Sequence, residues 1–94
     1  MPQPPVSAAA QEFGQRLRKQ RQAKKLTQLN LAYQSGSTVA AISNYENGRA
    51  LPSLSTLLDI AYVLEIDPGT LIKRLQPDTP PTELLAQPHR RRAT

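Results

Sequence analysis

Apolar residues recur at helical spacing along most of the chain, and short polar turns separate the stretches in which they do so. The clearest stretch follows Pro52. The residues that recur at helical spacing are Leu54, Leu57, Leu58, Ala61 and Leu64. Residues with this spacing share one face of an α-helix. The pattern predicts a helix that begins at Ser53, a residue type suited to the N-cap position.

Capping residues predict two helices nearer the N-terminus. The first begins near Ser7 and runs to about Ala23, and the second follows Thr27 and contains residues 28–34. Gly36 ends the second, because glycine readily adopts the left-handed conformation found just past a helix. Phe13, Leu17 and Arg21 share one face of the first helix, and Leu31 and Ala32 are the expected core contacts of the second.

Two further helices complete the pattern. One is capped by Thr38, runs to about Asn47 and ends at Gly48. The other starts at Asp67 and Pro68, a cap followed by a residue suited to the first turn. Their expected apolar faces are Ala41, Ile42 and Tyr45 in the former and Leu71, Ile72 and Leu75 in the latter. Short helices joined by short loops predict a compact all-α fold of five helices.

Both ends of the chain differ in composition from this middle part. Residues 1–6 and 76–94 contain seven of the nine prolines, and the second segment carries the basic run HRRR (89–92). Such segments bury too little apolar surface to offset the entropy of ordering. We therefore expect a disordered N-terminal arm at 1–6, a folded domain at 7–75 and a disordered, basic, proline-rich tail at 76–94.

Composition excludes several classes of site. The chain has no cysteine and one histidine, His89, so thiolate metal sites are excluded and no metal site or cofactor is expected. No apolar run approaches the ~20 residues that span a bilayer, and the first residues lack the pattern of a secretory signal. We expect a cytoplasmic protein without membrane contact. The net charge of +5 favours an anionic partner such as nucleic acid.

The positive charge is unevenly placed. No charged residue occurs from Leu26 to Tyr45, and basic residues cluster in the first helix, at Arg49, at 73–74 and at 90–92. An uncharged face is desolvated at low cost against base edges, while flanking cations neutralise phosphates. The arrangement favours a helix that enters a groove of nucleic acid.

Several short motifs lie in and around this neutral stretch. They are LTQ (26–28), LA (31–32), SG (35–36), IS (42–43), ENGR (46–49) and PSL (52–54). Together with the leucine-rich helix, they make residues 13–75 resemble the lambda-repressor-like family, the Cro-repressor or XRE-type helix-turn-helix proteins. The resemblance implies a five-helix DNA-binding domain, usually dimeric on DNA. The helix-turn-helix would span about 27–47, and its recognition helix, about 38–47, would enter the major groove.

The resemblance also assigns roles to individual positions. The residues that face base edges would be Thr38, Val39, Ala40, Ser43 and Asn44, and those that bind phosphates would be Gln28, Asn47, Arg49 and Ser53. Val39 and Ala40 depart from relatives that carry Arg or Gln there. They can pack on thymine methyl groups but cannot form bidentate hydrogen bonds with bases. Weak direct readout biased toward T and A, aided by DNA shape, and generally poor specificity both remain open.

Arg21 and Glu46 match family positions that form a partly buried ion pair between the first and third helices. The alternative is that both charges are simply exposed. Removing one partner of a buried pair typically costs about 3–5 kcal/mol, because the other charge is left uncompensated. A melting experiment on Glu46→Ala distinguishes the two.

Three functions remain open, and none involves a small-molecule ligand. The first is a sequence-specific transcriptional regulator, of repressor or controller type, that binds a two-fold related operator on double-stranded DNA as a homodimer. The second is an antitoxin whose helical domain binds a toxin and also represses its own operon, with the tail, especially TELLAQ (82–87), folding on the toxin. The third is a protein-interaction module that has lost DNA reading. An enzyme is not expected, since no nucleophile with a histidine partner and no glycine-rich phosphate loop is present.

Overall fold

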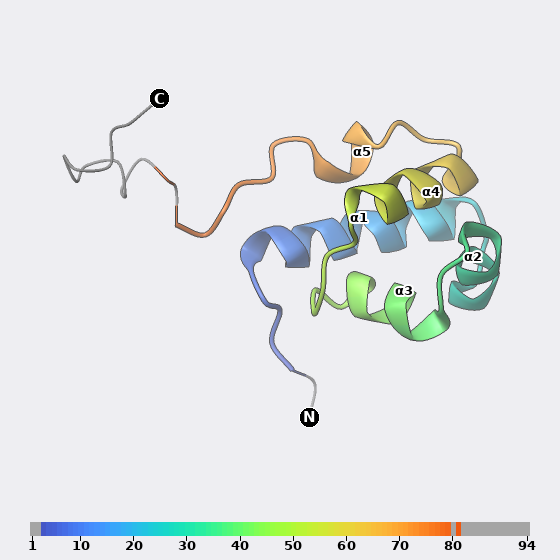
Figure 1. The fold of residues 1–94 in the computed structure, drawn as a ribbon, viewed down its shortest axis with the longest axis horizontal. Coiled ribbons are helices and arrows are strands. Elements are labelled where there is room, and N and C mark those ends of the chain that lie inside the picture. The colour runs from blue at the N-terminus through green and yellow to red at the C-terminus, as the bar shows by residue number, and fades with distance from the viewer. Residues whose placement is uncertain (1–2, 80, 82–94) are drawn as a thin grey trace.

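The protein is a bundle of short helices, shown as a ribbon in Figure 1. The computed structural model describes residues 3–79 and 81. The helices are α1 (Ala8–Ala23), α2 (Gln28–Ser35), α3 (Val39–Glu46), α4 (Leu54–Leu64) and α5 (Gly69–Ile72). The described residues contain no strand. The predicted all-α fold of five helices is confirmed.

The first four helices begin where the sequence places their caps. In each, a side-chain hydroxyl accepts a hydrogen bond from the backbone N–H three residues later, at 3.0 to 3.2 Å. These hydroxyls satisfy donors that a helix leaves unpaired at its start. The caps are Ser7, Thr27, Thr38 and Ser53.

Glycine is found at the end of only some of the helices. Gly36 ends α2 with a φ of 75°, and Gly48 follows α3 with a φ of 74°. Glu65 ends α4 in the same left-handed region, with a φ of 59°. A non-glycine residue in this region carries a steric cost, so the sequence offers no local signal for this turn.

The last helix is shorter than its apolar pattern predicts. Asp67 Oδ1 accepts a hydrogen bond of 2.7 Å from Gly69 N, but the N-cap of the helix is Pro68 and not the predicted Asp67. The helix ends at Ile72, and Leu75 packs against the core from beyond it. The chain leaves the helix at Lys73, whose backbone is extended with a ψ of 135°, and Arg16 Nη1 of α1 donates to the carbonyls of Leu71, at 3.3 Å, and Lys73, at 2.8 Å.

The core lies where α1 packs against α3 and α5, and α2 packs against α3 and α4. It is aliphatic apart from Phe13. Its other buried members are Leu17, Leu31, Ala32, Ile42, Leu57, Ile60, Leu64 and Leu71. The contacts predicted for Phe13, Leu17, Leu31, Ala32 and Ile42 are therefore confirmed.

At Gly14, α1 and α3 approach each other closely. A Cβ atom added there would lie 2.4 Å from the carbonyl oxygen of Tyr45 and 2.5 Å from that of Glu46. These are backbone atoms and cannot swing aside as a flexible side chain can. A residue without a side chain is what allows the two helices to pack at this distance.

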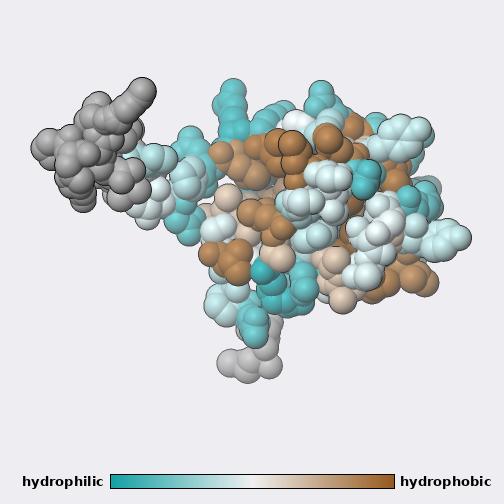
Figure 2. All heavy atoms as spheres, viewed as in Figure 1, coloured by the Kyte–Doolittle hydropathy of each residue, from teal (hydrophilic) through white to brown (hydrophobic). Residues whose placement is uncertain are grey.

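Two leucines of the α4 stripe lie outside the core. Leu54 is 68% exposed and Leu58 is 48% exposed, whereas Leu57, Ala61 and Leu64 are buried. The buried face also includes Ile60 and is centred to one side of the predicted stripe. Figure 2 shows apolar residues at the surface in this part of the molecule.

Residues beyond 7–75 also contact the domain. Val6 N donates to the Gly48 carbonyl at 2.8 Å, and Ala8 N donates to Asp78 Oδ1 at 3.0 Å. Val6 contributes a backbone N–H to these contacts, and Asp78 contributes a side-chain oxygen. The rest of the predicted arm and tail, including TELLAQ and HRRR, lies outside the described residues.

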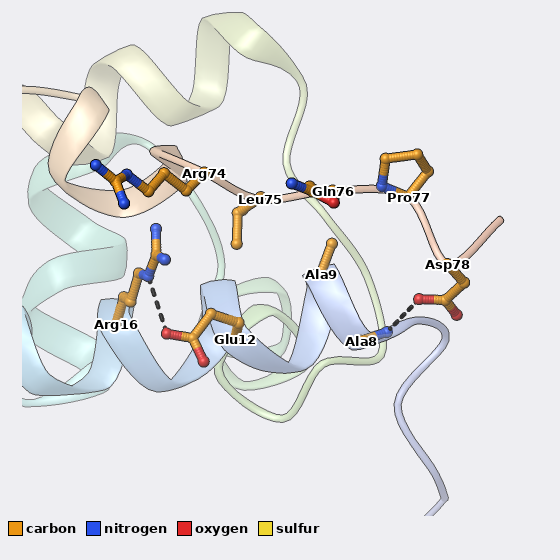
Figure 3. A pocket seen from close by; sticks show the side chains of 9 residues that line it. All are labelled: Ala8, Ala9, Glu12, Arg16, Arg74, Leu75, Gln76, Pro77 and Asp78. Carbon is orange, nitrogen blue, oxygen red and sulfur yellow. Dashed lines mark hydrogen bonds and ion pairs between the residues drawn. The ribbon is translucent and has the colours of Figure 1, made fainter. Parts of the chain in front are cut away.

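The segment after α5 and the first half of α1 enclose an open hollow, shown in Figure 3. Both of its carboxylates are engaged, Glu12 with Arg16 at 3.0 Å and Asp78 with the start of α1. The hollow is lined by Ala8, Ala9, Glu12, Arg16, Arg74, Leu75, Gln76, Pro77 and Asp78. The contact of Asp78 holds the segment after α5 on the start of α1.

Candidate nucleic-acid interface

The turn between α2 and α3 sets the position of the predicted recognition helix. Ser37 N donates to the Ala32 carbonyl at 2.8 Å, which closes the turn after Gly36. Ala32 and Ile42 are buried between the two helices. The small side chain of Ala32 allows α3 to cross close to α2, so α3 leaves its other side open to solvent.

The predicted base-reading residues share that open side. Thr38, Val39 and Ala40 are exposed, Val39 to 40%, and Ser43 and Asn44 are half-buried. The structure therefore leaves all five accessible at the surface of α3. None carries a charge, as the sequence shows.

The polar members of this set are already engaged within the protein. Asn44 Oδ1 accepts a hydrogen bond of 3.1 Å from Arg49 Nε. Ser43 Oγ accepts from Asn47 Nδ2 at 3.3 Å, and Thr38 Oγ1 caps α3. A carboxamide that reads adenine needs both its oxygen and its nitrogen. Asn44 can donate freely, but its oxygen is shared with Arg49.

A buried carboxylate joins three helices beneath this face. The Glu46 side chain is 0% exposed and receives two hydrogen bonds from Arg21, Nε to Oε2 at 2.6 Å and Nη2 to Oε1 at 3.0 Å. Arg18 Nε and Gln28 Nε2 also donate to Oε1, at 3.2 and 3.0 Å. Arg21 and Glu46 thus form a buried bidentate ion pair, and Arg18 and Gln28 extend it to a cluster.

The cluster stabilises Glu46 in its charged form. Burial by itself would raise the pKa of Glu46, but hydrogen bonds from Arg21, Gln28 and Arg18 outweigh it and hold that pKa below its ordinary value. The hydrogen bond to Glu46 likewise raises the pKa of Arg21. The ion pair therefore persists in neutral solution and down into the acid range.

The predicted phosphate-binding residues surround the recognition helix. Gln28 is the first residue of α2, and its side-chain amide donates a hydrogen bond to Glu46. Asn47 and Arg49 follow α3, where each makes a side-chain hydrogen bond to an α3 residue. Ser53 caps α4 and is exposed. All four thus lie at helix ends or in the loop after α3.

Arg18 is the residue at this site that the motifs did not single out. Its Nη2 donates to Asn47 Oδ1 at 3.2 Å, in addition to its contact with Glu46. It lies three residues before Arg21, and residues with this spacing are neighbours on a helix surface. That spacing was the available signal, but the sequence alone did not show which basic residues of α1 face α3.

Among the described residues, none of the helices has the length and apolar character needed to cross a membrane. The same part of the chain holds no cluster of three or more residues suited to a metal ion.

Comparison with known proteins agrees with this geometry. Residues 17–71, more than half of the chain, match the family model described as helix-turn-helix. The chain belongs to the helix-turn-helix family, in its lambda-repressor-like (XRE) branch. This helix-turn-helix chain is 39% identical over 61 residues to YqaE of Bacillus subtilis strain 168, an uncharacterized HTH-type transcriptional regulator. The match covers 65% of this chain and 53% of YqaE, so the chain spans about half the length of that relative.

Solved structures of this helix-turn-helix family share the fold. The restriction-modification controller protein C.AhdI from Aeromonas hydrophila matches with a TM-score of 0.66 and 41% identity, covering 68% of this chain and 97% of that one. The P22 c2 repressor in complex with a synthetic operator matches with a TM-score of 0.64 and 32% identity, covering 67% and 96%. Hydroxypropylphosphonic acid epoxidase from S. wedmorenis also matches, at 29% identity, but over only 36% of its chain.

Proposed function

We propose that this protein binds double-stranded DNA with α3 in the major groove and acts as a transcriptional regulator of repressor or controller type. On this proposal a homodimer binds a two-fold related operator. The observation that carries it is the uncharged, exposed face of α3, which is bordered by cations held in place by asparagines. The operator complex of the P22 c2 repressor supports the same use of the fold.

The flanks of α3 suit a phosphate backbone. Gln28 Nε2 carries two hydrogens, and Glu46 accepts only one of them. The other can donate to a phosphate at the start of α2, where free backbone N–H groups already favour an anion. Arg49 uses its Nε for Asn44, which leaves its two terminal nitrogens for a phosphate on the other flank.

Sequence readout on this proposal is weak and biased toward A·T pairs. Val39 and Ala40 present methyl groups, which pack on the methyl group of thymine. Asn44 offers its amide nitrogen, but Arg49 shares its oxygen, so its preference for adenine is reduced. Specificity would then depend in part on the shape and deformability of the site.

The alternative functions make different predictions. An interaction module without DNA binding would show no dependence of duplex affinity on salt, whereas contact with several phosphates gives a log–log slope of about −0.9 per phosphate. The segment that would bind a toxin, residues 82–87, lies outside the described residues. The proposed function is recognition, with no catalytic step.

Val39→Glu tests the proposal, and Tyr62→Glu is its control. Val39 is the first residue of α3, and an acidic residue at a helix N-terminus is favourable. The variant should therefore fold. Tyr62 is 85% exposed on α4 and tolerates the same charge. Binding to a random duplex is measured by fluorescence anisotropy.

Glu at position 39 places like charge against the duplex, which costs several kcal/mol, so we expect a loss of affinity of about 100-fold or more. The affinity of Tyr62→Glu for the duplex should remain much closer to that of the wild type. Equal affinities for the two variants would show that α3 is not the DNA-binding element.

A further inference from the structure

Arg18 is an exposed cation whose direction is fixed by the protein. Its Nε donates to the buried Glu46 and its Nη2 donates to Asn47, both at 3.2 Å. Even so, 46% of its side chain remains exposed. Within the described part of the chain, its Nη1 makes no hydrogen bond. The guanidinium therefore keeps donors for a ligand.

The charges around Glu46 do not cancel. Arg18 and Arg21 contribute two positive charges and Glu46 one negative charge, so the cluster carries a net charge of +1. Arg21 is bidentate, and its side chain is only 12% exposed. The surplus charge therefore appears at the surface through Arg18.

Arg18 has a counterpart at the same helix end. Arg49 Nε donates to Asn44 Oδ1, as Arg18 Nη2 donates to Asn47 Oδ1. Asn44 and Asn47 lie three residues apart and are neighbours on the helix surface. One arginine comes from α1 and the other from the loop after α3, so each is attached to the C-terminal end of α3 by an asparagine.

We propose that Arg18 binds a DNA phosphate and that Glu46 and Asn47 position it for this contact. The proposal rests on the proposed DNA-binding function and adds a residue to its phosphate contacts. A guanidinium already held in one orientation loses little side-chain freedom when a phosphate binds, and its planar fork suits phosphate oxygens. The buried ion pair thereby serves binding as well as folding, because the same Glu46 oxygen holds Arg18 and Gln28.

Arg18→Ala tests the inference, with Lys19→Ala as the matched control. The two residues are adjacent on α1 and each change removes one positive charge. Lys19, however, lines a hollow with Thr70 and Lys73 beside α5. The affinity for a random duplex is measured across a salt series for the wild type and both variants.

We expect Arg18→Ala to weaken binding by about tenfold and to reduce the magnitude of the log–log slope by about 0.9. Lys19→Ala should keep the slope of the wild type. Equal slopes for Arg18→Ala and the wild type, or equal reductions in the two variants, would overturn the inference. A flat slope in the wild type would instead reject the DNA-binding function itself.

Unfolding curves of the same samples separate positioning from stability. A purely structural role for Arg18 would lower the melting temperature and leave the salt slope unchanged. If Arg18→Ala fails to fold, Arg18→Gln takes its place, since Gln keeps an N–H donor near Glu46 but carries no charge. The expected reduction in slope is the same for that variant.

Discussion

At the scale of single residues, Glu46 holds together more of the fold than any other polar side chain described. It is buried and bonded to side chains of α1 and α2. We expect Glu46→Ala to destabilise the protein by about 3–5 kcal/mol, because Arg21 would be left uncompensated. For a domain of this size that lowers the melting temperature by about 12 °C or more. A melting curve like that of the wild type would contradict the role given to the ion pair.

The same residue predicts a pH dependence. The pKa of Glu46 is lower in the folded state than its ordinary value of about 4.3. The carboxylate therefore stabilises the fold above that pH, and this contribution is lost as pH falls through the lowered folded-state pKa. In denaturant titrations, the stability difference between the wild type and Glu46→Gln should shrink as pH falls below about 4. A difference that stays constant from neutral pH to pH 3 would exclude this linkage.

Replacing Gly14 with alanine should change stability in the direction opposite to the usual one. Gly→Ala in a helix interior usually stabilises by about 0.5–1 kcal/mol. Here the added Cβ would lie 2.4 Å from a backbone oxygen of Tyr45, and such overpacking costs about 1–3 kcal/mol. We expect Gly14→Ala to lower the free energy of unfolding, while Gln15→Ala on the exposed neighbour leaves it nearly unchanged. A stabilised Gly14→Ala variant would show that α1 and α3 are not packed this closely.

At the scale of elements, α5 depends on a side chain from α1. Arg16 satisfies the carbonyls of Leu71 and Lys73 at the end of this four-residue helix. Losing hydrogen bonds from a charged donor costs about 1.5 kcal/mol. We expect Arg16→Ala to accelerate amide hydrogen exchange selectively around residues 71–75, with Lys19→Ala as the control. Unchanged exchange there would mean that α5 is stable without this cap.

Helix starts could be predicted from the sequence, because capping is local. A hydroxyl at Ser7, Thr27 or Thr38 bonds to a backbone N–H three residues away, so a short stretch contains the whole interaction. The end of α4 at Glu65 gave no comparable signal. Position in the helix alone also did not reveal that Leu54 and Leu58 are exposed.

The candidate site could likewise be predicted from the sequence only in part. The motifs located the exposed face of α3 and the partners Arg21 and Glu46. They did not locate Arg18 or Gly14, whose partners lie on another helix, 28 residues away in the case of Arg18 and Glu46. Contacts between distant residues depend on how whole helices pack, and a residue's neighbours in sequence do not encode that packing.

At the scale of the whole molecule, the arrangement of charge matters more than its total of +5. Away from α3, Lys24 is paired with Glu65, which lowers the pKa of that glutamate, and Arg16 is paired with Glu12. Beside α3, Arg18 and Arg49 are held at asparagines and border a neutral surface. On the proposed function, this is the face that meets the duplex, with cations at the edges and apolar groups at the centre.

Selection of bound sites from a random DNA pool tests this account most directly. It predicts enrichment of two half-sites related by two-fold symmetry, with centres about 10 base pairs apart or a multiple of that distance. T and A should be favoured at the positions that face Val39 and Ala40. Recovery of sequences with no common motif and no preferred spacing would contradict the claim that α3 reads the major groove.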